Sequence, residues 1–198
     1  KGRVIRMKQI SEKLTQYVIR SGAVPPESYS IYQYGFQVGL ELFCSFMTCC
    51  VVAIILNMIL EFVIFTAIFM MLRTYAGGVH LERFSSCLMC SVGVQTLILS
   101  INDLLKVSLF VSWTLILICS ILVIKNAPVE SENKKLSLSE RKSLKRITKK
   151  VVFSVIFFTI ICSLLGTDRI VFLIALVFIA VLISQYIGLI KYHTNQDK

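Results

Sequence analysis

The 198-residue chain is 56% hydrophobic and 16% charged, with a mean hydropathy of +0.78 and a formal net charge of +10. So large an apolar fraction excludes a water-soluble globule of average composition and indicates an integral membrane protein. The basic stretches lack the interleaved aromatic side chains of a nucleic-acid surface. We therefore expect a phospholipid membrane as a partner and no nucleic acid.

The N-terminal region, residues 1–36, has the pattern of a cytoplasmic amphipathic helix that lies in the membrane interface. Its apolar residues recur at helical spacing, at Ile10, Leu14, Tyr17 and Val18. A second helix is predicted to begin at Pro25-Pro26-Glu27, because proline suits the first turn and glutamate the positive end of the helix dipole. It is expected to continue past Tyr34-Gly35 into the first span.

The start of the chain is basic and amphipathic, without the compact apolar segment and small-residue cleavage site of a secretory signal peptide. The chain opens on lysine, and Met7 is the expected natural start, with the residues before it as an added segment. Sequencing of the encoding gene would test this.

Residues 37–198 are predicted to form an all-α, polytopic bundle of about six transmembrane helices. The run 42–72 holds one charge and is too long for a single span of about 20 residues, so we divide it near Asn57. Further spans are predicted at 84–101, 104–124, 151–166 and 169–190, separated by polar breaks such as Asn102-Asp103 and the stretch 166–169. Glu61 falls at the outer turn, where we expect solvation, and Glu41 at the inner entry, where we expect a polar partner.

Basic residues predict the orientation, because lysine and arginine are retained on the cytoplasmic side during insertion. With both termini inside, 19 of the 21 basic residues fall in cytoplasmic segments, nine of them in the basic loop 125–150. The exceptions, Lys106 and Arg169, lie near span ends, from which long side chains reach the headgroups. This orientation places His80 on the cytoplasmic face.

His80 and Cys87 stand seven residues apart in the segment RTYAGGVHLERFSSC, between the second and third spans. A neighbouring imidazole can take the proton of a thiol and leave a nucleophilic thiolate. The pair therefore indicates a cysteine protease at the membrane edge. The competing interpretation is that Cys87 is a small packing residue, since cysteine is among the most often buried residue types.

Helical geometry constrains this pair. An uninterrupted helix would separate the two side chains by about 10.5 Å along its axis, beyond hydrogen-bond reach. The helix must therefore be broken, and Gly77-Gly78 supplies a flexible turn just before His80. Ser85 or Ser86 is the predicted cap of the next span, which leaves Cys87 in its first turn. Backbone N–H groups there would lower the thiol pKa and could donate to an oxyanion.

A zinc site is an alternative use of the same residues, since Cys87-x-x-Cys90 and His80 offer three nominal ligands. Both thiols lie in an apolar segment and no fourth ligand stands at a suitable spacing, so we expect neither a metal nor another cofactor. The seven cysteines are odd in number and lie in apolar spans or near the reducing side of the membrane, which predicts free thiols.

The pattern R-x-x-x-G-G-x-H-x-x-x-x-x-x-C resembles the active-site segment of the AgrB family, the membrane cysteine endopeptidases of Gram-positive quorum sensing. Its residues here are Arg73, Gly77, Gly78, His80 and Cys87. Tyr34-Gly35 before the first span, and Ala127-Pro128 followed by Lys134-Lys135, are similar to further features of the family. The resemblance covers essentially the whole chain in length, span order and motif order.

The resemblance implies a peptidase of the bacterial cell membrane that cuts the C-terminal part from a short AgrD-type pro-peptide. Cys87 would attack the scissile carbonyl, and His80 would accept the thiol proton and later protonate the leaving amine. The acyl group would then pass to a cysteine or serine of the peptide and close a thiolactone or lactone ring. Such an exchange needs no ATP where the site keeps water out.

Further roles in substrate binding or transition-state support are implied for Arg73, Gly77, Gly78, Lys134 and Lys135. Arg73 could equally anchor the end of the second span to headgroups. Lys134 and Lys135 are favoured for contact with an acidic peptide tail, within a loop that also suits anionic lipid. Glu82 could orient His80, but the family pattern has no matching acid.

A non-enzymatic transporter, a channel subunit or a partner that escorts a peptide to an exporter is the competing class. Six spans could form a transport unit by dimerising, but the sequence shows no convincing internal repeat and no ionisable residues in paired half-helices. Apolar faces left uncovered by short helices favour a homodimer. The oligomeric state, the ring size and the linkage stay open at this point.

Overall fold

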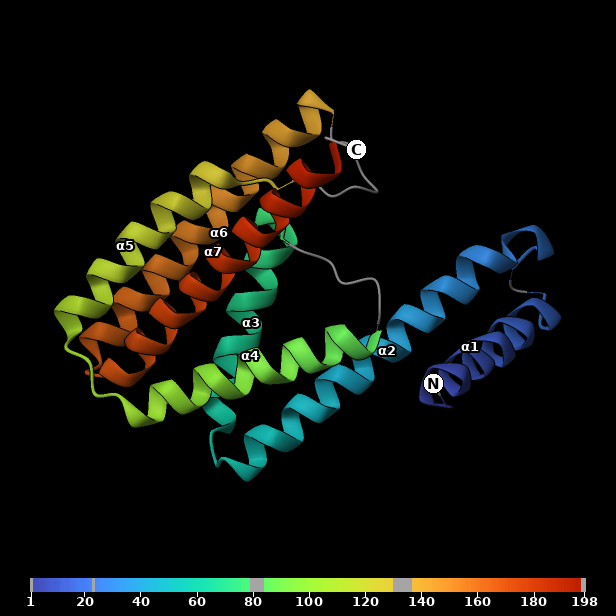
Figure 1. The fold of residues 1–198 in the computed structure, drawn as a ribbon, viewed down its shortest axis with the longest axis horizontal. Coiled ribbons are helices and arrows are strands. Elements are labelled where there is room, and N and C mark those ends of the chain that lie inside the picture. Colours follow the sequence, from blue (N-terminus) through green and yellow to red (C-terminus); the bar gives the residue numbers. More distant parts are fainter. Residues whose placement is uncertain (1, 23, 79–83, 130–136, 197–198) are drawn as a thin grey trace.

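The computed structural model describes residues 2–22, 24–78, 84–129 and 137–196, and of residues 2–8, 26, 84–87 and 191–196 only the backbone. Seven α-helices and a short 3-10 helix make up this part of the chain (Figure 1). In chain order they are α1 (Gly2–Arg20), η1 (Pro26–Ser28), α2 (Tyr29–Ile55), α3 (Ile59–Ala76), α4 (Phe84–Leu104), α5 (Leu109–Asn126), α6 (Leu138–Leu164) and α7 (Asp168–Gln196).

Six of these helices carry the apolar segments predicted to cross the membrane. Five of them, α2, α3, α5, α6 and α7, are long and apolar enough to span a bilayer, and α4 contributes a shorter apolar stretch, Leu88–Leu104. The predicted all-α, multi-pass membrane bundle is confirmed.

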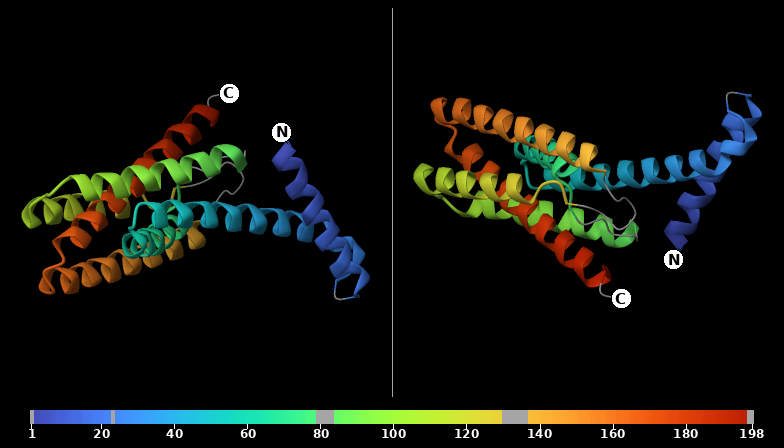
Figure 2. Two further views of the ribbon diagram at one scale, coloured as in Figure 1. Left: turned by 90° about the horizontal axis from the view of Figure 1, so that it is seen from below. Right: turned by 90° about the horizontal axis from the view of Figure 1, so that it is seen from above.

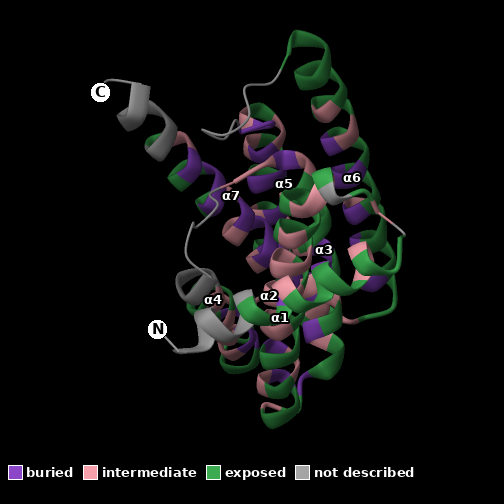
Figure 3. Ribbon diagram, turned by 90° about the vertical axis from the view of Figure 1, so that its right-hand side faces the viewer, coloured by how far each residue is buried: buried purple, intermediate pink, exposed green. Residues whose placement is uncertain are grey.

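The central helix of the bundle is α7, which packs against α3, α4, α5 and α6. Leu173, Ile174 and Phe178 are fully buried, in keeping with a helix that is apolar on every side. Buried residues gather on α7 and on the helices around it, whereas α1 and α2 are largely exposed (Figure 3). Helix α7 is therefore surrounded by other helices, whereas most of the surface of α2 is not covered by other parts of the protein.

Helix α1 and the first half of α2 form a hairpin that projects from the bundle, whereas the second half of α2 packs beside α4 (Figure 2). The face of α1 that is buried carries Ser11 and Thr15, and Gln33 of α2 donates a hydrogen bond to Glu12 at 3.3 Å. The predicted apolar stripe stays on the outside, with Tyr17 73% exposed. A helix in this place is confirmed, and so is the continuation of the second helix past Tyr34-Gly35 into the first span.

Two of the predicted breaks between spans use the same backbone turn. Asn57 and Gly166 take the left-handed conformation, with φ of 56° and 70°. After each, the next N–H donates to the carbonyl five residues earlier, Met58 to Ala53 at 2.9 Å and Thr167 to Cys162 at 3.0 Å. This is the Schellman termination of a helix, and it confirms the predicted division near Asn57.

The predicted break at Asn102-Asp103 is wrong in position. Helix α4 continues through both residues to Leu104, and α5 begins only at Leu109. Tertiary contacts explain the difference, because Asn102 is buried among neighbouring helices and Asp103 forms an ion pair.

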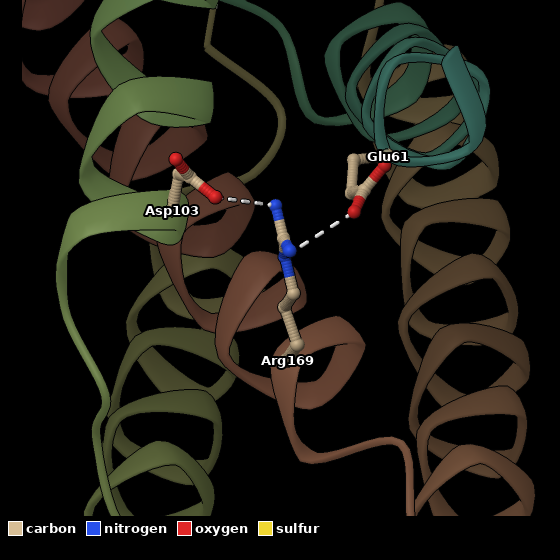
Figure 4. A network of polar contacts seen from close by, with 3 residues as sticks. All are labelled: Glu61, Asp103 and Arg169. Atoms are coloured by element: carbon tan, nitrogen blue, oxygen red, sulfur yellow. Dashed lines mark hydrogen bonds and ion pairs between the residues drawn. The ribbon is translucent and has the colours of Figure 1, made fainter. Parts of the chain in front are cut away.

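Arg169 joins the ends of three helices that meet at one end of the bundle (Figure 4). Its Nε lies 3.2 Å from Glu61 Oε1 of α3, and its Nη2 lies 2.9 Å from Asp103 Oδ1 of α4. The expectation that Glu61 is simply solvated is therefore wrong, since its side chain is 16% exposed and paired. Glu41 has the expected polar partner, because Gln37 Nε2 donates to its carboxylate at 3.1 Å.

Replacing Arg169 by glutamine removes both ion pairs at this end of the bundle. Because the guanidinium is 49% exposed, we expect a loss of only about 0.5–1 kcal/mol of stability, seen as a lower melting temperature of the purified protein. The exposed Lys106→Gln variant removes one positive charge nearby and serves as the control. An equal effect of the two substitutions would show that net charge, rather than the helix-joining contact, is responsible.

Candidate active site

The predicted nucleophile and base lie on either side of a helix boundary. Helix α3 ends at Ala76, before His80, and α4 is described from Phe84, so Cys87 belongs to a different helix from the one that precedes His80. Cys87 is the fourth residue of α4, which confirms its predicted place in the first turn. Ser85 and Ser86 already belong to the helix, so neither is its cap as predicted. His80 lies outside the described residues, as does the Cys87 side chain, and their mutual geometry stays a prediction.

Gly77 ends α3 at a place where only glycine fits. Its φ is +80°, a conformation that side chains disfavour. A Cβ atom there would also lie 2.6 Å from the carbonyl oxygen of Val129 and 2.9 Å from its nitrogen. The backbone after α5 therefore lies directly against the end of α3.

Gly78 allows a second close approach, from α7. A Cβ atom on Gly78 would lie 2.6 Å from Ser184 Oγ. The sequence suggested a flexible turn at Gly77-Gly78, whereas the structure packs both residues tightly against other elements. Their predicted contribution to substrate binding stays a prediction.

The last carbonyl groups of α3 accept hydrogen bonds from three different elements. Such groups lack partners within their own helix and must be satisfied when buried. Thr148 Oγ1 of α6 donates to the Tyr75 carbonyl at 2.9 Å. The Ala76 carbonyl accepts from Val129 N at 3.0 Å and from Gln185 Nε2 of α7 at 3.2 Å. The chain is thereby fixed where it leaves α3, four residues before His80.

Sequence reasoning missed Thr148, Ser184 and Gln185. The available signal was the presence of Ser184 and Gln185 within the predicted span 169–190, because polar side chains at such depth usually have a specific partner. Nothing in the sequence indicated that this partner was the end of α3, since the two positions are 109 residues apart.

Arg73 lies in the last turn of α3, with its guanidinium carbon 5.8 Å from the centre of the Phe69 ring. This distance suits a cation–π contact within one helix face. The side chain is half-buried, and its predicted roles at the substrate or at the headgroups stay open.

The second half of the segment 125–150 is helical. Helix α6 begins with a capping box, in which Ser137 N donates to Glu140 and Glu140 N donates to the Ser137 hydroxyl. Six exposed basic residues follow on one half of the helix surface, at Arg141, Lys142, Lys145, Arg146, Lys149 and Lys150. Lys134 and Lys135 precede this helix and lie outside the described residues.

Among the residues with described side chains, no three of the types His, Cys, Asp and Glu are grouped closely enough to hold a metal ion. Cys90 is an exposed free thiol one turn beyond Cys87 on α4. The alternative of a zinc site needs His80 and the Cys87 side chain as well. Because neither is among the described residues, this alternative stays untested.

Together, the fold and the glycine-rich boundary between α3 and α4 define a helical, multi-pass membrane protein with a fixed chain segment ahead of a first-turn cysteine. Residues 11–189 match the model of the family AgrB, accessory gene regulator B. The chain belongs to this family.

Two relatives come from Clostridium perfringens. "Putative AgrB-like protein 2" of strain 13 / Type A is 24% identical over 170 residues, which are 80% of this chain and 78% of the relative. "Putative AgrB-like protein" of strain SM101 / Type A is 26% identical over 169 residues, which are 80% of this chain and 76% of the relative. No solved structure gives a significant match.

Alanine at Gly77 tests the close contact with Val129. Because both the positive φ and the backbone clash oppose a Cβ atom, we expect Gly77→Ala to destabilise the protein by about 1–3 kcal/mol. Gly93→Ala is the matched control, since a Cβ atom on Gly93 would meet nothing within 4 Å. Thermal unfolding of both variants in detergent checks this, and similar melting temperatures would contradict the observed packing.

Proposed function

We propose that this protein is a membrane-embedded cysteine endopeptidase that cleaves an AgrD-type pro-peptide and cyclises the retained part. Membership of the AgrB family over residues 11–189 carries the proposal. It is supported by the separation of α3 from α4, because His80 follows the end of α3 and Cys87 lies in α4, as a chain break near this pair requires.

The position of Cys87 suits a thiolate. It is the fourth residue of α4, where unpaired backbone N–H groups and the positive end of the helix dipole favour negative charge. The imidazole of His80 accepts the thiol proton, and the resulting ion pair holds the nucleophile ready. The same N–H groups are candidates to stabilise the oxyanion that forms during attack.

The reaction proceeds in two acyl transfers. The Cys87 sulfur attacks the scissile carbonyl, the peptide C–N bond breaks, and the proton on His80 passes to the leaving amine. A cysteine thiol or serine hydroxyl of the retained peptide then attacks the thioester and gives its proton to His80. The Cys87 thiolate leaves, and a thiolactone or lactone is released. Thiolactone closure exchanges one thioester for another and so needs no ATP, provided that water is excluded.

The proposed site lies at the cytoplasmic edge of the bacterial cell membrane, with both termini also in the cytoplasm. The charge distribution supports this orientation, because the six exposed basic residues at the start of α6 lie on the same side of the bundle as the end of α3. The exposed apolar surface of α2 leaves room for a homodimer in the membrane.

Substitution of the catalytic pair tests the mechanism most directly. When the protein is co-expressed with its pro-peptide, we expect Cys87→Ser and His80→Ala to abolish cleavage, as judged by gel and mass spectrometry. The matched controls are Cys90→Ser, an exposed thiol on the same helix, and His193→Ala, the other histidine. Both should cleave at the wild-type rate. Cleavage that persists in Cys87→Ser would exclude this residue as the nucleophile, and a transporter would keep its flux in that variant.

Lys134 and Lys135 are proposed to hold the acidic tail of the pro-peptide. Neutralising both with glutamine should raise KM severalfold and leave kcat nearly unchanged, because the contact is lost equally in the ground state and the transition state. Lys149→Gln with Lys150→Gln is the control of equal charge, at exposed positions on α6. The assignment fails if the two double variants have the same KM.

A further inference from the structure

Gln185 is a fully buried amide in the apolar central helix α7. Its Nε2 group donates to the Ala76 carbonyl of α3 at 3.2 Å and to the Val123 carbonyl of α5 at 3.4 Å. Both carbonyls belong to the last turns of their helices, where the negative ends of two helix dipoles meet. An amide NH2 group suits this place, because it offers two donors and an apolar side chain offers none.

Ser184 holds the next point of the chain. The residue is buried, with a relative exposure of 8%, and its hydroxyl lies against Gly78, where a Cβ atom would be only 2.6 Å away. Within the described residues, neither the Ser184 hydroxyl nor Gln185 Oε1 has a hydrogen-bond partner. Buried polar groups of this kind cost stability, so simple packing would be served better by apolar side chains.

We propose that Ser184 and Gln185 are positioning residues for the peptidase reaction, which fix the chain at Ala76–Gly78 and thereby align His80 with Cys87. Gln185 fixes the last carbonyl of α3, and Ser184 sets the distance between α7 and Gly78. His80 follows Gly78 by two residues in the sequence, so this anchor determines where the segment that carries the imidazole begins. The inference rests on the proposed function for its catalytic consequence, but the anchor itself is a property of the protein alone.

The kinetics of Gln185→Met distinguish a role of Gln185 in aligning the catalytic pair from a role in protein stability alone. Methionine has nearly the same size but no donor, so we expect kcat for pro-peptide cleavage to fall about ten-fold or more, with KM changed by less than about two-fold. The control is Gln95→Met, because Gln95 is equally buried and donates to the Cys49 carbonyl at 2.9 Å between α4 and α2. This control should lose stability and keep its kcat, and an equal loss of kcat in both variants would overturn the proposal.

Hydrogen exchange measures the anchor without any substrate. We expect Gln185→Met, but not Gln95→Met, to increase deuterium uptake in the peptide that covers residues 77–83, with Ser184→Ala giving a smaller increase. Unchanged uptake in Gln185→Met would overturn the positioning role. Failure of the wild-type protein to cleave its pro-peptide would instead count against the proposed function, and the two failures are thus distinguishable.

A suppressor pair tests Ser184 independently. In Gly78→Ala the new Cβ atom meets the Ser184 hydroxyl at 2.6 Å but its Cβ atom at 3.5 Å, an ordinary contact. Adding Ser184→Ala should therefore restore part of the activity that Gly78→Ala loses. It should restore none in Gly77→Ala, where the clash is with the Val129 backbone. The absence of any restoration at Gly78, or equal restoration at both glycines, would contradict the proposed contact.

Discussion

The arrangement of the candidate site depends on the need to satisfy buried carbonyl groups at the end of α3. A helix that ends at the surface leaves these groups to water, but α3 ends among α6, α7 and the chain that follows α5. Each neighbour supplies a donor of a different kind: a threonine hydroxyl, a glutamine amide and a backbone N–H. The constraint explains why glycine follows at once, because the Val129 backbone, which donates one of these bonds, lies closer to Gly77 than a Cβ atom permits.

Helix α7 takes part in fastening both ends of α3. Near its start, Arg169 pairs with Glu61 in the first turn of α3, and further along, Gln185 holds the final carbonyl. Between these points the contact is apolar and closely packed. Polar contacts at the two ends fix the axial position of one helix against the other, which apolar packing alone leaves less well defined. The segment before His80 therefore has a defined starting point.

The fold was largely predictable from the sequence, and the anchor of the site was not. Spans separated by Asn57 and by Gly166 could be divided correctly, because a left-handed residue after a long apolar run ends a helix locally. The end of α4 was placed too early, because burial of Asn102 and the ion pair of Asp103 are tertiary effects. The spacing of His80 and Cys87 indicated a break between helices, which local sequence encodes. The role of Gln185 depends on a contact across 109 residues, for which the local pattern gives no partner.

The capping box at Ser137 fixes where α6 begins, and thereby how far the helix extends beyond its contact with α3. The helix begins at Leu138, ten residues before Thr148, so about 15 Å of helix lies between its start and the bonded threonine. Four of the six exposed basic residues lie on this part of α6, and Lys149 and Lys150 follow Thr148, whose hydroxyl donates to the Tyr75 carbonyl. A ligand on the basic face of α6 would therefore bind the same helix that holds the Tyr75 carbonyl, five residues before His80.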